Sequence, residues 1–363
     1  MSAATAAPLP IAADGELRVG VLGVGRIGRM HAELLHRQVG GARVSRIHDA
    51  YAPAAAAVGT QLGVAVSDST AALLAADDVD AVAICTSTDT HVELIVAAAQ
   101  AGKAIFCEKP ISLDLAEMDR ALAAVEAAGV PFQIGFNRRF DPAHASVRAA
   151  VVDGTVGDPQ IVRISSRDPE PPPLEYVRHS GGIFLDMTIH DFDMARFVTG
   201  SEVVSVSAQG ALRIRPEFAE AGDVDTAVVT LQHENGCLTT IDNSRQAAYG
   251  YDQRVEVHGS RGMAASEDPR AHTGIVRTAA GEHAPSLPHF FVDRYTVAYL
   301  AQWQAFVAAL RDGRTPPVTA ADGRAPLAIG LAAGRSLRER RPVSLAEIEA
   351  DAASASGSNG ASA

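Results

Sequence analysis

The sequence predicts an α/β protein in which an N-terminal, doubly wound parallel sheet precedes an α+β domain with a large, mostly antiparallel open sheet. Short apolar runs alternate with helical patterns up to Gly135, which is typical of a parallel sheet. A glycine-rich turn joins the first of these runs to a helix. Beyond residue 137 the apolar residues recur with period two, which is typical of antiparallel strands. A chain of 363 residues is long enough for both domains.

The first domain is expected to cover residues 17–137. Its predicted strands are Leu17–Leu22, Arg43–Ile47, Ala81–Cys85, Ala104–Cys107 and Phe132–Ile134, and its clearest helices are Val92–Gln100 and Leu115–Ala128. Ligands of doubly wound sheets bind at the carboxyl ends of the strands. We therefore expect the residues that follow these strands to share one crevice; they are Gly23, Asp49, Thr86, Ser87, Thr88, Glu108 and Lys109.

The second domain is expected to cover residues 138–345. It begins with a helix over Pro142–Val152, and a helical segment is predicted over Gly181–Val198. The predicted strands are Gln160–Ser166, Val203–Ala208, Ala227–Gln232, Cys237–Ser244 and Arg254–His258, followed by helices at Phe291–Arg311 and Ala325–Arg340. Residues 1–16 and 346–363 are rich in alanine, serine and glycine, so we expect disordered tails there.

Composition excludes several classes of function. The formal net charge is −12 and no basic run is present, which argues against nucleic acid or an anionic membrane surface as a partner. No apolar stretch approaches the ~20 residues that a membrane span needs. The cysteines Cys85, Cys107 and Cys237 are scattered, so they form neither a disulfide framework nor a metal site, and they indicate a reducing cytoplasm.

The glycine-rich turn has the spacing of a dinucleotide-binding loop. Gly23, Gly25 and Gly28 form G-x-G-x-x-G, with Arg26 and Ile27 between the last two glycines. The first glycine permits the tight turn, the second lets the backbone approach a pyrophosphate, and the third lets the helix pack closely on its strand. The helix N-terminus then offers N–H groups to the phosphates. A purely structural turn can use the same spacing.

An acidic residue completes this Rossmann fingerprint. Asp49 ends the second strand and follows Gly28 by 21 residues, close to the ~20 expected for a carboxylate that binds ribose hydroxyls. A carboxylate repels a 2′-phosphate, and no arginine follows at Ala50 or Tyr51. We therefore predict NAD as the cofactor. The alternative is an aspartate that only caps the next helix.

Lys109 lies in E-K-P at the carboxyl end of a predicted strand. A lysine at this place can hydrogen-bond a substrate hydroxyl and stabilise developing alkoxide charge. The alternative is a surface lysine in a turn. Thr86, Ser87, Thr88 and Glu108 are predicted cofactor contacts at the same edge of the sheet, and His91 either lies beside the nicotinamide or packs in the core.

A second constellation lies in G-G-I-F-L-D-M-T-I-H-D-F-D, residues 181–193. Asp186 and His190 are four residues apart, which places them on one face of a helix. A carboxylate bonded to one imidazole nitrogen leaves the other as a base, and alcohol oxidation by hydride transfer needs such a base. A structural pair is the alternative. Asp191 and Asp193 are expected to be solvated or capping residues.

Two further candidates are less specific. Arg138 and Arg139, in F-N-R-R-F-D, could hold a polyol or carboxylate, or form ion pairs with neighbouring residues. Tyr249 could line a pocket or simply pack. No Cys/His cluster has metal-ligand spacing, so no metal is expected, and no G-x-S-x-G motif supports a hydrolase.

Four ordered motifs together resemble the Gfo/Idh/MocA oxidoreductases. They are G-V-G-R-I-G-R-M-H-A in the glycine loop, E-K-P at 108–110, G-F-N-R-R-F-D at 135–141 and G-G-I-F-L-D-M-T-I-H-D-F-D-M-A-R-F at 181–197. The resemblance runs from about residue 17 to about residue 345. The segment S-R-D-P-E-P-P-P-L-E-Y-V before Gly181 is similar to the branch that acts on inositols.

The resemblance implies an NAD-dependent dehydrogenase acting on CH–OH. Lys109 matches the family's E-K-P lysine, Asp186 and His190 match its catalytic pair, and Arg139 and Tyr249 match positions that line the polyol pocket. The first-choice reaction is oxidation of myo-inositol to its 2-keto product. Dehydrogenation of scyllo-inositol or of an aldopyranose, or a non-catalytic sensor on the same fold, are the alternatives. The family also implies a homotetramer built through the sheet of the second domain.

Overall fold

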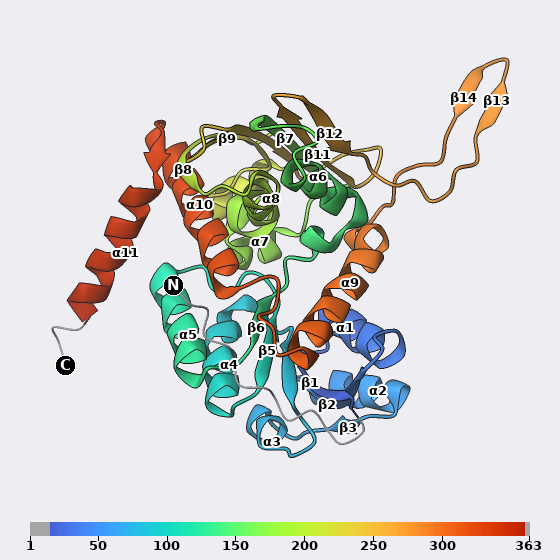
Figure 1. The fold of residues 1–363 in the computed structure, drawn as a ribbon, viewed down its shortest axis with the longest axis vertical. Helices are drawn as coiled ribbons and strands as arrows, with labels where there is room; N and C mark the ends of the chain where they lie inside the picture. Colours follow the sequence, from blue (N-terminus) through green and yellow to red (C-terminus); the bar gives the residue numbers. More distant parts are fainter. Residues whose placement is uncertain (1–14, 360–363) are drawn as a thin grey trace. The chain divides into compact units, whose positions relative to one another are not determined.

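The chain divides into two compact units, and the computed structural model describes residues 15–359. Of the described residues, the first unit holds 15–137 together with Tyr299–Ala325, and the second holds Arg138–Ala298 and 326–359. The helices and strands can be followed along the chain by colour in Figure 1. The predicted boundary at residue 137 is where the chain first passes from one unit to the other. The prediction did not include the later return of residues 299–325 to the first unit.

The first unit contains a six-stranded parallel sheet. Its strands are β1 (Leu17–Leu22), β2 (Ala42–His48), β3 (Ala65–Val66), β4 (Ala81–Ile84), β5 (Ala104–Cys107) and β6 (Phe132–Ile134). They lie in the order β3-β2-β1-β4-β5-β6, which is the doubly wound dinucleotide-binding order. The direction of winding reverses between β1 and β4, so this edge is the expected ligand crevice. The predicted parallel fold is confirmed.

Helices connect these strands. They are α1 (Arg26–Arg37), α2 (Ala52–Leu62), α3 (Thr70–Leu74), α4 (Thr88–Gln100) and α5 (Leu115–Ala128). Helix α5 shows how local signals in the sequence predict where a helix begins and ends. The Asp114 carboxylate accepts the backbone N–H of Glu117 at its start, and Gly129 ends it in the left-handed conformation at φ +63°.

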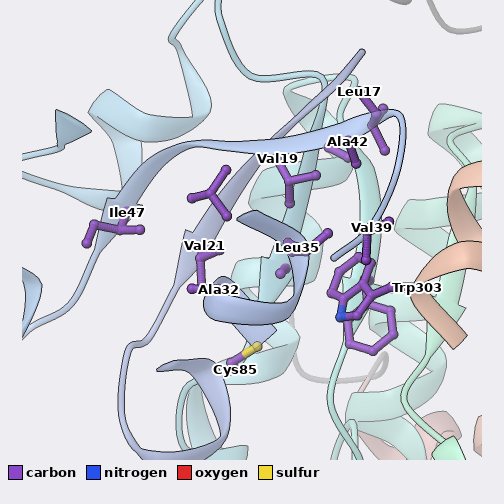
Figure 2. Packing of buried hydrophobic residues seen from close by; sticks show 14 of the residues in the cluster. Leu17, Val19, Val21, Ala32, Leu35, Val39, Ala42, Ile47, Cys85 and Trp303 are labelled. Atoms are coloured by element: carbon purple, nitrogen blue, oxygen red, sulfur yellow. The ribbon is translucent and has the colours of Figure 1, made fainter. Parts of the chain in front are cut away.

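An indole from far along the chain completes the core of the first unit. Trp303 lies on α9 (Phe291–Arg311) and is fully buried among the side chains of β1, α1 and β2 (Figure 2). Phe306, Val307 and Leu310 of the same helix join it. A contact between positions so distant in sequence leaves no local pattern, so the sequence did not indicate that residues 299–325 pack with the first unit.

The second unit is built on a seven-stranded sheet. Its strands are β7 (Pro159–Arg167), β8 (Val203–Ala211), β9 (Thr226–His233), β10 (Leu238–Ser244), β11 (Asp252–Gly259), β12 (Gly262–Ser266) and β15 (Val343–Ser344). They lie in the order β12-β11-β7-β10-β9-β8-β15. Every pairing is antiparallel except that of β7 with β10, so the predicted mostly antiparallel sheet is confirmed.

The remaining elements of this unit are helices and one separate hairpin. They are η1 (Asn137–Phe140, which begins at the last residue of the first unit), α6 (Pro142–Val152), α7 (Leu174–Ser180), η2 (Ile183–Met187), α8 (Ile189–Thr199), η3 (Pro216–Ala221), β13 (Val276–Thr278), β14 (Gly281–His283), α10 (Ala320–Glu339, which begins in the first unit) and α11 (Leu345–Asn359). The hairpin β13–β14 forms a two-stranded sheet apart from the large one (Figure 1).

The predicted helix over Gly181–Val198 is wrong in one respect, because two segments replace it. Gly181 and Gly182 both have positive φ, a π-helical turn follows at η2, and the regular helix α8 starts only at Ile189. A Cβ on Gly182 would lie 2.7 Å from Oδ1 of Asp223, so a glycine is required there. π-helical turns of this kind are frequent at functional sites.

The C-terminal prediction also needs correction. Residues 345–359 form helix α11, where a disordered tail was expected from residue 346. The Ser344 hydroxyl accepts the backbone N–H of Glu347, and the Glu347 carboxylate accepts the backbone N–H of Ser344, which is a capping box. Residues 1–14 and 360–363 lie outside the described part of the chain. Among the described helices, none is both long and apolar enough to cross a membrane.

Candidate functional site

The glycine loop of the first unit has the geometry of a phosphate-binding turn. Gly23 has a φ of +85°, and a Cβ on it would lie 2.8 Å from the carbonyl oxygen of Cys85. A Cβ on Gly28 would collide with the carbonyl oxygen of Gly23. Gly25, by contrast, is the exposed N-cap of α1 and faces open space. Two glycines are therefore needed by the turn itself, and the third leaves the backbone accessible to a ligand.

No acidic side chain lies in the first turn of α1, so its N-terminal N–H groups keep their attraction for anions. Arg26, the first residue of the helix, is exposed beside them. Ile27 instead packs against the hydrophobic core. Of these two predicted cofactor contacts, Arg26 is placed to add positive charge and Ile27 to anchor the helix.

Asp49 is held directly beside this loop. Its Oδ2 accepts the backbone N–H of Val24 at 2.7 Å, and its Oδ1 accepts the backbone N–H of Tyr51 at 2.8 Å. The second bond closes a turn just before α2, whose N-cap is Tyr51 and has no side-chain cap, so the helix-capping alternative for Asp49 is not observed. Each oxygen retains a further lone pair with which a ribose hydroxyl can bond.

The ends of β4 and β5 supply the other predicted cofactor contacts. The hydroxyls of Thr86 and Thr90 are 2.6 Å apart, Ser87 is the N-cap of α4, and Thr88 is its first residue. His91 is buried between two backbone carbonyls, with Nδ1 2.8 Å from the oxygen of Pro110 and Nε2 3.1 Å from that of Thr86. Burial lowers the pKa of His91, which favours the neutral ring. A neutral imidazole has one N–H, so it donates a hydrogen bond to one of these two carbonyls.

Lys109 follows Glu108 at the end of β5, as predicted. The peptide bond between Lys109 and Pro110 is cis. Glu108 is nearly buried, and its Oε2 accepts the backbone N–H of Lys109 at 3.2 Å. Both belong to the first unit, whereas Asp186 and His190 belong to the second.

The polar cluster of the second unit lies at the carboxyl ends of its two parallel strands. Ser244 of β10 pairs with Arg167 of β7, and each strand is followed at once by a charged residue, Arg245 and Asp168 respectively. The backbone N–H of Asp168 donates to the carbonyl of Ser244 at 2.9 Å, which keeps the two ends together. The rule that placed ligands at strand ends in the first unit therefore also applies here.

Asp186 lies in the π-helical turn and is held from two sides. The Tyr176 hydroxyl of α7 donates to its Oδ1 at 2.8 Å, and Nη1 of the fully buried Arg245 lies 3.3 Å from its Oδ2. Arg245 also reaches Oδ2 of Asp223 at 3.7 Å, and Oδ1 of Asp223 accepts the backbone N–H of Ile183. The guanidinium thus connects the carboxylate of the turn to the backbone that begins it.

His190 is the second residue of α8, directly after that turn. A regular helix through both Asp186 and His190 was expected, but Asp186 lies in the π-helical turn and His190 lies in the regular helix that follows it. The two residues come from adjacent turns of the same segment, and their pairing as base and orienting carboxylate stays a prediction.

Burial also changes the ionisation of groups around Asp186, among them Asp168. Burial raises the pKa of Asp168 to about 6, the nearby Asp186 carboxylate adds to the rise, and Arg245 opposes it. Burial and Asp186 likewise raise the pKa of the Tyr176 phenol above its ordinary value, so it remains a donor at neutral pH. Perturbed groups gathered around one carboxylate are typical of functional sites.

The two arginines of F-N-R-R-F-D form ion pairs with α8. Arg138 lies 2.7 Å from Asp191, and Arg139 lies 2.6 Å from Asp193. The expectation that these two aspartates are solvated or capping is wrong, because both are buried. Ser166 and Asn243 also donate to Asp191, which compensates for the loss of water. Of the alternatives for Arg139, the structure shows an ion pair, and its contact with a polyol stays a prediction.

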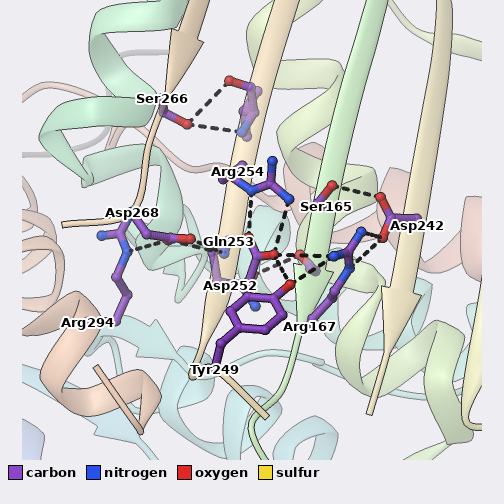
Figure 3. Close-up of polar contacts among 12 residues, drawn as sticks. Ser165, Arg167, Asp242, Tyr249, Asp252, Gln253, Arg254, Ser266, Asp268 and Arg294 are labelled. Atoms are coloured by element: carbon purple, nitrogen blue, oxygen red, sulfur yellow. Dashed lines mark hydrogen bonds and ion pairs between the residues drawn. The ribbon is translucent and has the colours of Figure 1, made fainter. Parts of the chain in front are cut away.

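Tyr249 lies in a separate polar cluster on the loop before β11 (Figure 3). Its hydroxyl accepts from Nη1 of Arg167 at 2.8 Å and donates to Oδ2 of Asp252 at 2.5 Å. The residue is half exposed. These contacts belong to the Arg167–Asp252 cluster, and the predicted role of Tyr249 in a polyol pocket stays untested.

Four residues around Asp186 were not singled out from the sequence. They are Asp168, Tyr176, Asp223 and Arg245. Arg245 could have been found from the sequence, because it directly follows the predicted strand Cys237–Ser244, and Asp168 lies two residues after the predicted strand Gln160–Ser166. Tyr176 and Asp223 reach the site from a short helix and a loop, for which no sequence pattern was available.

Comparisons with known proteins identify the family. Residues 17–136 match the oxidoreductase family with an NAD-binding Rossmann fold, and residues 144–265 match the GFO/IDH/MocA C-terminal domain. The cofactor predicted from the glycine loop and Asp49 is confirmed as NAD.

Several relatives align over almost the whole chain. A myo-inositol 2-dehydrogenase of Thermotoga maritima is 46% identical, with 92% of this chain and 99% of the relative aligned. An inositol 2-dehydrogenase of Rhizobium meliloti is 47% identical over 91% and 99%. A scyllo-inositol 2-dehydrogenase (NAD(+)) of Bacillus subtilis is 38% identical over 92% and 97%.

Solved structures agree with these matches. A protein from Thermotoga maritima described as a probable dehydrogenase superposes with a TM-score of 0.90 at 46% identity, covering 92% of this chain and 100% of its own. A scyllo-inositol dehydrogenase from Lactobacillus casei, with bound NAD(H) and scyllo-inositol, has a TM-score of 0.86 at 30% identity, covering 91% and 99%. The chain belongs to the GFO/IDH/MocA family of NAD-dependent oxidoreductases.

Proposed function

We propose that the protein oxidises a ring hydroxyl of a cyclitol, with myo-inositol converted to 2-keto-myo-inositol (scyllo-inosose). The observation that carries the proposal is the fixed Asp186 carboxylate, held by Tyr176 and Arg245 immediately before the helix that bears His190. A carboxylate restrained in this way is suited to orient an imidazole and to balance its charge when it takes up a proton.

Three side chains divide the chemistry. His190 accepts the proton of the reacting hydroxyl as a general base, a contribution typically of ~10²–10⁴-fold. Asp186 orients it and stabilises the imidazolium. Lys109 donates hydrogen bonds to the same oxygen and stabilises its developing negative charge. Bound NAD supplies the hydride acceptor.

The first unit supplies the cofactor contacts. The glycine loop and the N-terminus of α1 would hold the pyrophosphate, and Asp49 would hold the adenosine ribose. The open space at Gly25 and the orientation of Asp49 support this assignment. Thr86, Ser87, Thr88, His91 and Glu108 are proposed to line the nicotinamide end of the same strand edge.

The similarity to relatives favours myo-inositol, because the two relatives at 46% and 47% identity are named for myo-inositol and inositol, whereas the scyllo-inositol enzyme is 38% identical. A scyllo-inositol dehydrogenase is the second candidate. It is supported by that Bacillus subtilis relative and by the Lactobacillus casei structure with bound scyllo-inositol.

A polyol panel tests the proposal. Purified protein is assayed for NAD reduction at 340 nm with myo-inositol, scyllo-inositol and glucose. We expect the highest kcat/KM with myo-inositol. A preference for scyllo-inositol selects the second candidate and a preference for glucose selects an aldopyranose dehydrogenase. If NAD binds but no polyol is oxidised, the protein is a sensor and the proposal is wrong.

We also propose that the protein is a cytoplasmic homotetramer assembled through the outer face of the seven-stranded sheet. Residues along β9 alternate between buried and exposed, and the exposed positions of the sheet include large apolar side chains. These are Ile161, Val204, Val228, Leu238 and Met263. Exposed apolar patches of this kind mark interfaces. Light scattering on a size-exclusion column should give four times the chain mass of 37.8 kDa, and Val228→Asp should reduce it.

A further inference from the structure

A buried histidine of the first unit has no part in the proposed chemistry. His31 lies on α1, shortly after the glycine loop, and is fully buried. Its ring meets the rings of Phe106, Tyr299 and Trp303 edge-on, with centroids 5.4, 5.5 and 5.7 Å away. An imidazole enclosed by three aromatic rings depends on protein partners for both nitrogens.

The partners of His31 determine where its proton lies. The indole Nε1–H of Trp303 is only a donor, and it lies 2.8 Å from Nδ1 of His31. Nδ1 must therefore be the accepting, unprotonated nitrogen. Nε2 then carries the proton and donates it to Oε1 of Glu108 at 2.8 Å. The hydrogen bonds consequently run in one direction, from Trp303 through His31 to Glu108.

Glu108 transmits this arrangement to its neighbour in the chain. Its Oε2 accepts the backbone N–H of Lys109, so both carboxylate oxygens are engaged. The space around it is closed as well, because a Cβ on Gly135 would lie 2.9 Å from Oε1. Rotation of the carboxylate would break a bond at each end, so the orientation of Glu108 and the backbone at Lys109 are set together.

We propose that His31 is a positioning residue, which holds Lys109 in its working position through Glu108 while Trp303 selects the required tautomer. This inference rests on the proposed role of Lys109. A misplacement of a catalytic group by ~1 Å can cost ~10²-fold in rate, so a chain of restrained groups behind that lysine has a large possible effect. The same chain links α1, which begins at the cofactor loop, to the end of β5.

Two isosteric variants separate the two hydrogen bonds of His31. In His31→Gln the side-chain amide nitrogen can occupy the place of Nε2 and still donate to Glu108. In His31→Asn the amide oxygen can occupy the place of Nδ1 and accept from Trp303, but the bond to Glu108 is lost. In each variant the side chain at position 31 loses one of its two hydrogen bonds. If the role of His31 were purely structural, the two variants would therefore lower kcat and Tm by similar amounts.

The readouts are kcat and KM for myo-inositol with NAD, the Kd of NAD, and Tm. We expect His31→Asn to lower kcat by ~10-fold or more, while His31→Gln stays within ~3-fold of the wild type and NAD affinity changes little in either. Gln302→Ala is the control, because Gln302 is buried on α9 but takes no part in the hydrogen bonds from Trp303 to Glu108, so kcat should not fall, whatever the change in Tm.

A double-mutant cycle then tests whether His31 acts through Lys109. Lys109→Met combined with His31→Asn should be no slower than Lys109→Met alone. The positioning role is overturned, and the role of Lys109 stands, in either of two cases. In the first, kcat of both His31 variants falls only in proportion to their loss of Tm. In the second, the kcat losses of His31→Asn and Lys109→Met add fully in the double variant. If Lys109→Met turns over normally, the proposed role of Lys109 itself fails, and the positioning role with it.

Trp303→Phe provides a second route if the His31 variants do not fold. It keeps an aromatic ring in the core but removes the N–H that selects the tautomer. We expect kcat to fall several-fold with an unchanged Kd for NAD. An unchanged kcat in a folded Trp303→Phe protein would contradict the proposal that the hydrogen bond from Trp303 fixes the tautomer of His31.

Discussion

The two units build their polar sites by different means. In the first unit the polar site is formed mainly by backbone groups, because the glycine loop and the N-terminus of α1 need only small residues at three positions. In the second unit side chains from separate elements converge on Asp186, and one of them, Arg245, also lies close to Asp223. A backbone site is encoded locally and is visible in the sequence. A side-chain network depends on which strand ends and loops the fold brings together.

The difference extends to tolerance of substitution. A site made by backbone N–H groups is lost mainly through changes of glycine, whereas a network of paired charges is sensitive at each member because a lost partner leaves a buried charge uncompensated. The following predictions test this contrast, beginning with the largest expected effect.

Replacing the proposed base should have the largest effect. His190→Ala should lower kcat/KM for the polyol by ~10²–10⁴-fold, since no other group is proposed to take the proton. Asp186→Asn should lose less, because the imidazole remains and only its orientation and charge partner change. The measurement is steady-state kinetics with NAD saturating. The double variant should resemble His190→Ala, and fully additive losses would mean that the two residues do not act as a unit.

Cofactor choice tests the first unit. Because Asp49 is oriented by the loop and no arginine follows it, kcat/KM should favour NAD over NADP by at least ~10-fold, or ~1.4 kcal/mol. Asp49→Ala should lower the ratio of kcat/KM with NAD to kcat/KM with NADP, mainly because NAD binds more weakly. Comparable efficiency with both cofactors in the wild-type protein would contradict the assignment of Asp49 to the ribose.

Two tyrosines of the second unit provide a matched pair. Tyr176→Phe removes the hydroxyl that donates to Asp186 and should lower kcat by several-fold, because a hydrogen bond that restrains this carboxylate is lost. Tyr249→Phe removes a hydroxyl from the Arg167–Asp252 cluster and should leave kcat within ~2-fold. A larger loss in Tyr249→Phe than in Tyr176→Phe would instead support the polyol-pocket role predicted for Tyr249.

The smallest predicted effect concerns stability and pH. Burial raises the pKa of Asp168 to about 6, above the ~3.9 of an unfolded chain, so the folded state binds more protons between these values. The contribution of Asp168 to stability is therefore present below pH ~4 and is lost as pH rises through about 6. Asp168→Asn should be more stable relative to the wild type at pH 7 than at pH 4. Thermal unfolding at the two pH values measures this, and an equal difference at both would contradict it.

Much of the fold could be predicted from the sequence. The strands Leu17–Leu22, Ala104–Cys107 and Phe132–Ile134 and the helix Leu115–Ala128 have the bounds that were expected. Their apolar periods, caps and terminal glycines act over a few residues, so no tertiary information was needed. The same is true of Gly23, Gly25, Gly28 and Asp49, whose roles follow from strand, turn and helix in succession.

Only the tertiary structure decided the contacts between residues that are far apart in the chain. Trp303 completes the core of the first unit and bonds His31 across 272 positions, and Arg245 meets Asp186 across 59. From the sequence, Asp191 and Asp193 were expected to be solvated or capping residues, but in the structure they form ion pairs with Arg138 and Arg139. The period of a helix or strand shows which face is apolar, but it carries no information about which distant charge neutralises a buried one. The sequence alone therefore determined the elements, the cofactor loop and the candidate residues, while folding decided which of those residues have partners.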